Sequence, residues 1–380
     1  MASREFLEDI TLHLNANVFT RTFSFSAAQL PVVASPPPPL ADHVVLVDGF
    51  GLVIDLCERK GRARLKSGEI EKWFENEVLR KGVERIRHTR DLLRSYDGIS
   101  LVNSRGHRVS VAPKGLDDAA GLILHRSPRA GGYVPPRFRK SRKFGFVHIM
   151  RDSDYISICE HLVTPSQLAD YLKFRQEIFS RPFPVPPEAN EAALLGQFLF
   201  EELEAPADAR YETAARAFRD DPNTSAFSYV LQNLSTQIAK RDDESVEAIY
   251  QRILAELARL GRRELRELKT QLRLSLEAVR ADRFELPYRV TCTPTQCCFL
   301  VLPGSAEFRL RAREALESLA LASKYELGVQ KQVSIAMWRS GRIIDIDWLY
   351  TEGPNVPDET LARRLEHAYP FRRTSERQFL

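Results

Sequence analysis

Two aspartates near the start of the chain occur in a pattern that could bind a divalent cation. Asp42 and Asp55 lie in the segment DHVVLVDGFGLVIDLCERKG, in which two apolar, β-branched runs flank a glycine-containing turn. This pattern predicts a β-hairpin. With the turn centred just after Gly49, Cys57 lies opposite Asp42. Asp55 then lies opposite Val44, and the two aspartates share one face with Cys57.

Two carboxylates on one face of a hairpin are close enough to share a cation, because opposite and diagonal side chains lie about 5–8 Å apart. A three-residue loop would change the register and weaken this geometry. Asp55 also needs an explanation of its own, because a carboxylate among the apolar residues of LVIDLC loses hydration. It requires a metal, a basic partner or the surface. The alternative to a metal site is a strand near the sheet edge, with Asp55 solvated or paired with an arginine.

The same segment resembles a known family. DHVVLVDGFGLVIDLCERK is similar to the core of the PD-(D/E)XK nuclease superfamily, and most of all to its nuclease-related (NERD) branch. In that branch an aspartate heads one strand, a hairpin follows, and an acid-x-lysine triplet ends the next strand. Asp42 matches the first acidic position and Asp55 the second. The expected order of helix, strand, hairpin and helix also matches, and the resemblance covers roughly residues 1–115.

The resemblance implies a site for metal-dependent hydrolysis of DNA or RNA. Asp42 and Asp55 would hold Mg²⁺ or Mn²⁺, which activates a water and stabilises charge on the scissile phosphate. Glu5 and Glu8, on a first helix predicted from the spacing of Phe6, Ile10 and Leu14, lie where relatives often place a further metal ligand.

The sequence departs from the family at the lysine, because that position is Cys57. A thiol cannot supply the fixed positive charge. Lys60 is the nearest replacement, although in a regular strand it faces away from Asp55 unless a bulge or an early strand end brings it round. Lys72 or Lys81 on the following helix could also substitute, and nothing in the sequence selects between them.

A basic segment from residue 126 to 143 is the second candidate site. The glycine and proline pairs Gly131-Gly132 and Pro135-Pro136 predict a loop, and the aromatic residues Tyr133 and Phe138 are interleaved with the cations. Such a loop could neutralise phosphates and stack bases, whereas a solvated flexible loop is the plainer interpretation. No acid occurs among its cations, which are Arg126, Arg129, Arg137, Arg139, Lys140, Arg142 and Lys143.

The elements that must position these residues predict an α/β chain of three parts. Residues 1–180 are expected to form a restriction-endonuclease-like mixed sheet with flanking helices. This part is expected to include a strand over residues 20–26 and a helix with Thr164 as its cap. The proline-rich run at 181–187 is the clearest linker. A helical region at 188–285 and a small α/β or α+β domain at 286–380 are expected to follow.

Composition limits the class of protein. The chain has 380 residues, 43% of them hydrophobic, and its 55 basic and 51 acidic residues give a net charge of +4, so any argument for a nucleic-acid partner must be local. No apolar stretch is long enough to cross a membrane, and the first residues do not form a signal peptide, so a cytoplasmic protein is expected. The five cysteines are expected to be reduced thiols. A zinc site at Cys292, Cys297 and Cys298 is disfavoured, because a second ligand pair is missing.

Two functions follow from these observations. The first is a Mg²⁺- or Mn²⁺-dependent nuclease that acts on DNA or RNA through Asp42, Asp55 and Lys60. The second is a module that has lost catalysis and that binds nucleic acid, another protein or a second copy of itself, for example in a genome-defence complex.

Overall fold

The structure is a computed structural model that divides into two compact units, residues 1–220 and 221–380. The described residues are 18–26, 29–31, 38–47, 50–59, 67–103, 108–111, 119–126, 133–181, 190–200, 210–213, 215, 223–239, 244–354 and 359–372. The amino-terminal helix predicted around Phe6, with Glu5 and Glu8, lies outside them, as do Lys60 and Arg129.

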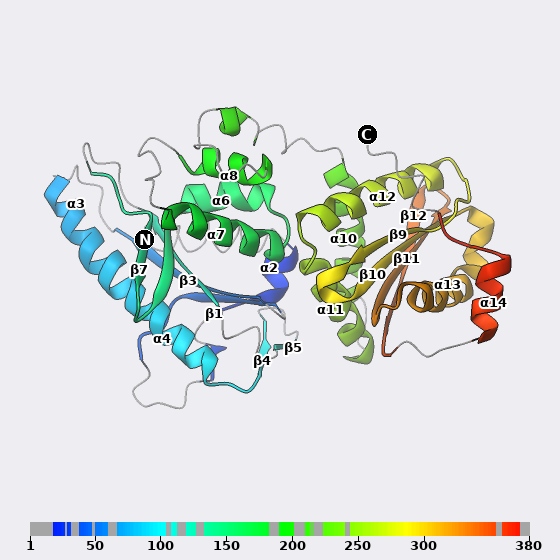
Figure 1. The fold of residues 1–380 in the computed structure, drawn as a ribbon, viewed down its shortest axis with the longest axis horizontal. Helices are drawn as coiled ribbons and strands as arrows, with labels where there is room; N and C mark the ends of the chain where they lie inside the picture. The colour runs from blue at the N-terminus through cyan, green and yellow to red at the C-terminus, as the bar shows by residue number, and fades with distance from the viewer. Residues whose placement is uncertain are drawn as a thin grey trace. The chain divides into compact units, whose positions relative to one another are not determined.

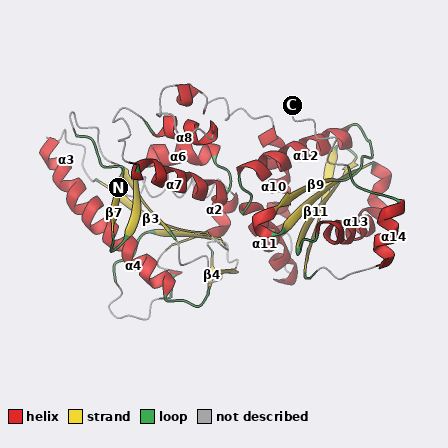
Figure 2. Cartoon of the chain, in the orientation of Figure 1, coloured by secondary structure: helices red, strands yellow, loops and turns green. Residues whose placement is uncertain are grey.

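The first unit is built on a six-stranded mixed sheet with helices on both faces (Figures 1 and 2). The strand order is β1-β2-β3-β6-β8-β7, and β3, β6 and β8 are parallel to one another. The strands are β1 (Ser24–Ser26), β2 (His43–Val47), β3 (Phe50–Glu58), β6 (Ala120–Arg126), β7 (Phe138–Ser141) and β8 (Gly145–Arg151). A separate hairpin contains β4 (Ile99–Val102) and β5 (Arg108–Val111). The unit is therefore a mixed α/β structure, as the sequence predicted.

One face of this sheet carries a long helical run and the other carries three helices. The run consists of α3 (Ser67–Trp73), η2 (Phe74–Gly82) and α4 (Val83–Arg94), in which η2 is a π-helical segment with wider turns. It buries Ile70, Phe74, Val78, Ile86 and Leu93, which recur at helical spacing in the sequence. The opposite face carries α6 (Asp152–His161), α7 (Pro165–Ser180) and α8 (Glu191–Phe200); a further helix, α2 (Val18–Phe23), precedes β1.

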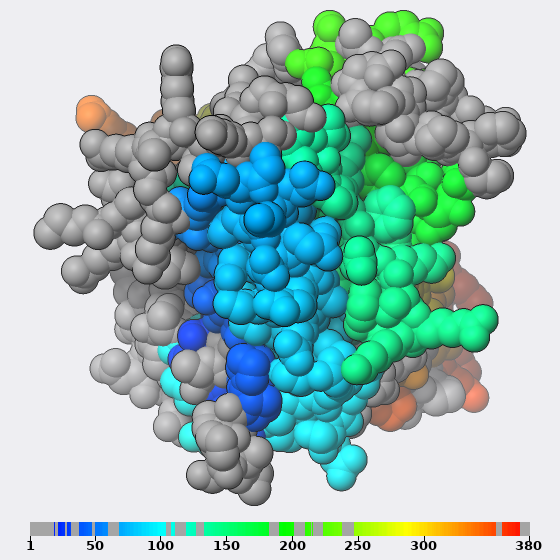
Figure 3. Space-filling view, turned by 90° about the vertical axis from the view of Figure 1, so that its left-hand side faces the viewer, coloured from blue at the N-terminus to red at the C-terminus, as the bar shows by residue number. Residues whose placement is uncertain are grey.

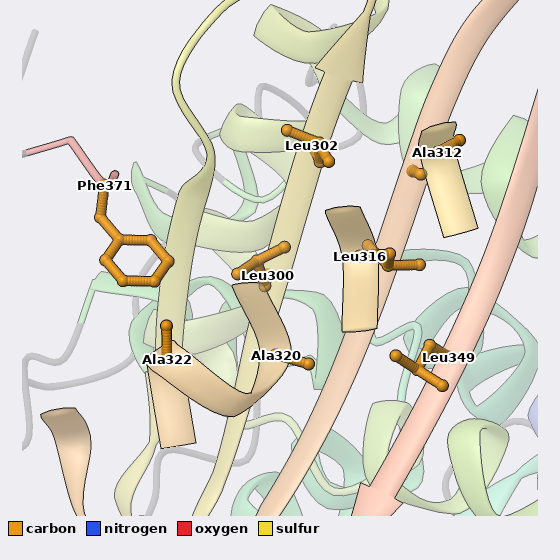
Figure 4. Packing of buried hydrophobic residues seen from close by; sticks show 9 residues of the cluster. Leu300, Leu302, Ala312, Leu316, Ala320, Ala322, Leu349 and Phe371 are labelled. Atoms are coloured by element: carbon orange, nitrogen blue, oxygen red, sulfur yellow. The ribbon is translucent and has the colours of Figure 1, made fainter. Parts of the chain in front are cut away.

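The second unit is a four-stranded sheet of strand order β12-β11-β10-β9. A crossover through α13 joins the parallel pair β10 and β11, and the outer strands are antiparallel. Leu300, Leu302 and Leu349 of the sheet pack against Leu316 of α13, and Phe371 completes this core (Figure 4). Helix α12 lies on the other face, next to α10 (Figure 1). The strands are β9 (Tyr288–Cys292), β10 (Cys297–Gly304), β11 (Lys331–Ser340) and β12 (Ile343–Glu352). The helices are α10 (Asn223–Ala239), α11 (Glu244–Ala258), α12 (Arg262–Arg280), η3 (Thr293–Thr295), η4 (Ala306–Arg311), α13 (Ala312–Leu327) and α14 (Glu359–His367).

Several local predictions can be compared with these elements. The strand expected over residues 20–26 is wrong over most of its length, because residues 18–23 form α2 and only residues 24–26 extend. Thr164 does cap α7, since its side chain accepts from the backbone of Gln167 and Pro165 is the first helical residue. Helix α6 was not predicted. The division into units at residue 220 differs from the three expected parts, because α8 lies in the first unit.

No helix among the residues that the structure describes is long and apolar enough to cross a membrane. All five cysteines are free of disulfide bonds.

Candidate functional site

The β2–β3 hairpin exists, but its register differs from the predicted one. Val44 lies opposite Val53, and His43 lies opposite Ile54, so the turn is centred one residue earlier than expected. The backbone of Asp42 continues this pattern by donating to Ile54 O at 3.1 Å. Because the difference amounts to two residues of the partner strand, the predicted face is unchanged. Asp42 consequently lies next to Asp55, whereas the predicted register placed it opposite Cys57.

Asp55 is completely buried and is bound by an arginine. Arg85 on α4 donates from Nε to Asp55 Oδ1 at 2.6 Å and from Nη2 to Asp55 Oδ2 at 2.7 Å. The Asp55 side chain is 0% exposed, whereas that of Arg85 is 24% exposed. This bidentate, charge-assisted pair is the arginine partner that the sequence left open as an alternative to a metal.

The carboxylate of Asp42, the second acid of the expected metal site, also accepts a hydrogen bond from the protein. Asp42 Oδ2 accepts a hydrogen bond of 2.7 Å from the backbone N–H of Leu56. This bond fixes the Asp42 carboxylate against the backbone of β3, two residues before the end of that strand. Both aspartates therefore serve the local structure of the hairpin.

Cys57, which replaces the family lysine, is a neutral thiol. Its Sγ donates to Asp55 Oδ2 at 3.3 Å and lies 3.6 Å from the backbone O of Glu77 in η2. Burial raises the pKa of the Cys57 thiol, and the charge of Asp55 raises it further. The thiol therefore stays protonated at neutral pH and cannot supply the positive charge that the lysine brings in the family.

The helix comes very close to this cluster at Gly82. A Cβ at that position would lie 3.0 Å from Asp55 Oδ2 and 3.0 Å from Ile123 Cδ1. The glycine thus allows η2 to close one side of the Asp55 carboxylate, while Arg85 closes the other. Burial raises the pKa of Asp55 to about 6, although the Arg85 hydrogen bonds lower it. The carboxylate is ionised at neutral pH and its charge is balanced by the guanidinium.

These residues do not fit a divalent cation. Mg²⁺ requires several oxygen ligands with open lone pairs, and both oxygens of Asp55 already accept from Arg85. Among the described residues, no group of three or more His, Cys, Asp or Glu side chains could hold a metal ion. Of the substitute lysines, Lys72 is exposed and Lys81 pairs with Glu77 at 2.8 Å. Glu8 and Lys60 lie outside the described residues.

Within the basic segment, residues 127–132 lie outside the described residues, residues 133–137 have no regular structure, and residues 138–143 belong to the β7–β8 hairpin. The second half of the segment forms β7 and the turn that leads into β8. Strand β7 is an edge of the six-stranded sheet. Two of its arginines serve as structural ion pairs: Arg126 Nε donates to Asp152 Oδ2 at 2.6 Å, and Arg137 Nη2 donates to Glu191 Oε2 at 2.8 Å. The remaining described cations, Arg139, Lys140, Arg142 and Lys143, are exposed to solvent.

A buried arginine holds this hairpin in place. Arg90 on α4 donates from Nη1 to Phe144 O at 2.9 Å and from Nη2 to Phe146 O at 3.2 Å. Its Nε donates to Ala119 O at 2.6 Å, so one guanidinium joins the starts of β6 and β8. Desolvation lowers the pKa of Arg90 to about 10, at which it remains charged at neutral pH. Figure 3 shows the helical run in blue to cyan, beside the blue-green part of the unit that contains β7 and β8.

The other end of β7 is tied down by a buried ion cluster. Glu191, at the start of α8, accepts from Arg175 Nε at 2.7 Å, from Arg137 and from the hydroxyl of Tyr171. Burial would raise the pKa of Glu191, but the two arginines lower it to about 2. Arg175 is 0% exposed and also donates to Ile149 O at 3.0 Å. The exposed cations are therefore carried on a hairpin with a fixed position.

Sequence reasoning missed the three arginines that organise this unit. Arg85 and Arg90 lie in the segment ERIRHTRDLLR, which reads as an ordinary charged helix, and Arg175 lies in a helix with no unusual pattern. The only available signal was the buried aspartate in LVIDLC, which requires a partner without naming one.

Comparison with known proteins returned no match, whether against family models, curated proteins or solved structures. The function is therefore inferred from the chain's own residues.

Proposed function

We propose that this protein binds nucleic acid through the β7–β8 hairpin and does not hydrolyse it at Asp42 and Asp55. The observation that carries the proposal is a set of four exposed cations within five consecutive residues of one hairpin, Arg139, Lys140, Arg142 and Lys143. No ion pair joins any of the four to another described residue, so their charge is free for phosphates.

The position of these cations favours a role in binding. Arg139 and Lys140 lie on the edge strand β7, and Arg142 and Lys143 lie on the turn that joins β7 to β8. This hairpin is anchored by Arg90 at the turn and by Glu191, through Arg137, at the start of β7. A preordered strand loses little conformational entropy when it binds, which favours affinity. The resemblance of the β2–β3 hairpin to PD-(D/E)XK nucleases supports a nucleic-acid ligand, and the Asp55–Arg85 pair argues against metal-dependent cleavage.

A competing explanation is that the charges protect the edge. Exposed lysines on an edge strand prevent pairing with another sheet, and this role needs no ligand. The two explanations make different predictions. If the cations bind phosphates, the affinity of the protein for DNA or RNA depends on these side chains, and if they only protect the edge, it does not.

The test is the salt dependence of binding. Fluorescence anisotropy with labelled single-stranded DNA, duplex DNA and single-stranded RNA gives the affinity at several salt concentrations. Replacing all four cations by Gln is expected to reduce the slope of log K against log salt by about 3, since each phosphate contact contributes roughly 0.7–0.9. The matched control replaces four exposed arginines of the second unit, Arg263, Arg266, Arg309 and Arg311, and removes the same net charge. Equal slopes for the wild type and the hairpin variant would contradict the proposal.

The absence of hydrolysis has its own test. Plasmid, linear DNA and RNA are incubated with Mg²⁺ or Mn²⁺, and the wild type and the Asp42→Ala and Asp55→Asn variants are expected to show the same background. Cys57→Lys is expected to leave this background unchanged, because Arg85 still holds Asp55. Cleavage that depends on Asp42 or Asp55 would show that the acids act as metal ligands after all.

A further inference from the structure

We propose that the ligand of the β7–β8 hairpin is a single strand of DNA or RNA, one base of which stacks on Phe144; this inference rests on the nucleic-acid function proposed above. Phe144 lies in the turn of the hairpin, directly after the exposed cations Arg142 and Lys143. Because consecutive Cα atoms are about 3.8 Å apart, the side chains of both cations begin within about 8 Å of Phe144. Groups that can bind phosphates and a ring that can stack on a base therefore occur together in one turn.

The ring of Phe144 has no aromatic partner in the part of the chain that the structure describes. Three other phenylalanines near this hairpin pack on one another, with ring centroids 5.0 Å apart for Phe138 and Phe146 and 5.3 Å apart for Phe138 and Phe179. Phe144 makes no ring contact with a described residue, and it is half-buried. A base that stacks on Phe144 would cover apolar surface that the fold leaves exposed.

The turn that carries Phe144 is held in one conformation by three features. The backbone N–H of Lys143 donates to Ser141 Oγ at 3.2 Å, and Phe144 O accepts from Arg90 Nη1 at 2.9 Å. Gly145, the next residue, has a φ of 71°, which glycine adopts without strain. Phe144 and the cations before it are thus ordered in advance, so a ligand gains their contacts at a small cost in conformational entropy.

The sheet around the hairpin disfavours a duplex as the ligand. A two-stranded β-ribbon can enter the major groove and read the edges of paired bases. Strand β8, however, pairs with β6 from Val147 onward, so only the two β7–β8 pairs next to the turn lie outside this pairing. The rest of the sheet keeps the ribbon from filling a groove. A single strand has no such requirement, because its unpaired bases can turn outward and expose the face on which Phe144 stacks.

The first test compares a tract of thymidines with a DNA duplex of the same length. Charge alone favours the duplex, since its two strands together present twice as many phosphates per unit length as one strand. The wild type is nevertheless expected to bind the single strand more tightly at the same salt concentration, because stacking adds to the phosphate contacts. A uridine tract shows which of DNA and RNA is bound more tightly. Equal or tighter binding of the duplex would overturn the proposal.

The second test changes Phe144 itself. Phe144→Leu is expected to weaken binding of the thymidine tract at least about fivefold, which is the lower end of the range for base–aromatic stacking. It is expected to leave the slope of log K against log salt unchanged, because no charge is removed. Phe144→Tyr keeps the ring and is expected to keep the affinity. Phe308→Leu, at a half-buried phenylalanine of η4 in the second unit, is the matched control. Wild-type affinity of a folded Phe144→Leu protein for the thymidine tract would contradict the assignment.

The third test removes the bases and keeps the phosphates. The wild type is expected to bind a tract of abasic sites about as weakly as Phe144→Leu binds the thymidine tract, and Phe144→Leu is expected not to distinguish the two tracts. Equal affinity of the wild type for both tracts would refute stacking, whether or not the variant folds. The nucleic-acid proposal fails separately, if the wild type and the four-cation variant have equal salt slopes. A reduced slope in that variant, with no effect of Phe144→Leu, would refute the role of Phe144 alone.

Discussion

The Asp55–Arg85 pair leads to a sharp prediction about stability. Arg85→Met keeps most of the volume of the side chain and removes the partner of a carboxylate that is 0% exposed. Breaking a buried pair by removing one member costs about 3–5 kcal/mol, because the remaining charge is left without compensation. Arg85→Met combined with Asp55→Asn removes both charges and is expected to recover a large part of this loss.

The cost of Arg85→Met is expected to depend on pH. In the wild type the folded-state pKa of Asp55, about 6, lies above the usual value of 3.8. The contribution of Asp55 to the free energy of unfolding therefore decreases as the pH rises through that interval. Arg85 lowers this pKa, and its removal raises the pKa further. The variant is therefore expected to fall further behind the wild type at pH 8 than at pH 5, where Asp55 is largely protonated in both proteins.

Hydrogen–deuterium exchange measured on β3 and α4 peptides reports the local free energy of opening in this unit alone. A loss of 3–5 kcal/mol corresponds to exchange that is about a hundredfold to a few thousandfold faster after correction for intrinsic rates. Arg87→Met on the same helix is the matched control. Its side chain is 25% exposed, like that of Arg85, but its partner Asp91 is 53% exposed, so a loss below about 1 kcal/mol is expected. Equal effects of Arg85→Met and Arg87→Met would refute the reasoning.

Three further predictions concern other contacts. Gly82→Ala is expected to lower the free energy of unfolding by about 1–3 kcal/mol, because the new methyl group meets Asp55 and Ile123. Gly68→Ala, with nothing within 4 Å of the new methyl group, is expected to stabilise α3 by about 0.5–1 kcal/mol. Hydrogen exchange of α3 and α4 peptides checks both. Glu191 has a lowered pKa of about 2, so the stability that its carboxylate gives to the first unit is complete above about pH 4.5 and is lost as the pH falls toward 2. A Glu191→Gln variant whose stability depends on pH in this range as that of the wild type does would argue against this. Phe371→Ala is expected to destabilise the second unit by about 3–5 kcal/mol in exchange of β9 and β10 peptides, and Leu310→Ala, at a side chain 93% exposed, by less than about 0.5 kcal/mol.

Most elements of the fold could be predicted because their patterns are local. The apolar spacing of Ile70 to Leu93 and the pair Thr164–Pro165 are readable without knowledge of the rest of the chain. The hairpin was predicted for the same reason, but its register was not, since the apolar pattern does not decide at which residue the turn is centred. The wrong prediction at residues 20–23 has a similar origin. The Thr and Phe residues of this segment favour strands, but it forms part of a helix whose Phe19 and Phe23 are buried by tertiary packing.

The candidate site could be predicted only in part, because the partners of buried charges come from distant segments. Asp55 was identified as a residue that needs compensation, yet Arg85 is 30 positions away and its helix contains several other arginines. The basic segment was predicted as a loop, whereas its residues 138–141 form strand β7 and present part of its charge on a hairpin. Its glycines and prolines precede β7, and the residues that order the strand, Arg90 and Glu191, lie far outside the segment.

The ion cluster around Glu191 determines where the first unit ends. A fragment cut within the prolines at 181–187 would keep Arg175, which is 0% exposed, and would discard the carboxylate that neutralises it. Such a fragment would contain an unpaired cation in its interior and should be prone to aggregate. A fragment that continues through α8 keeps its charges matched, so the piece of this chain that could be produced or exchanged as a whole extends beyond the apparent linker.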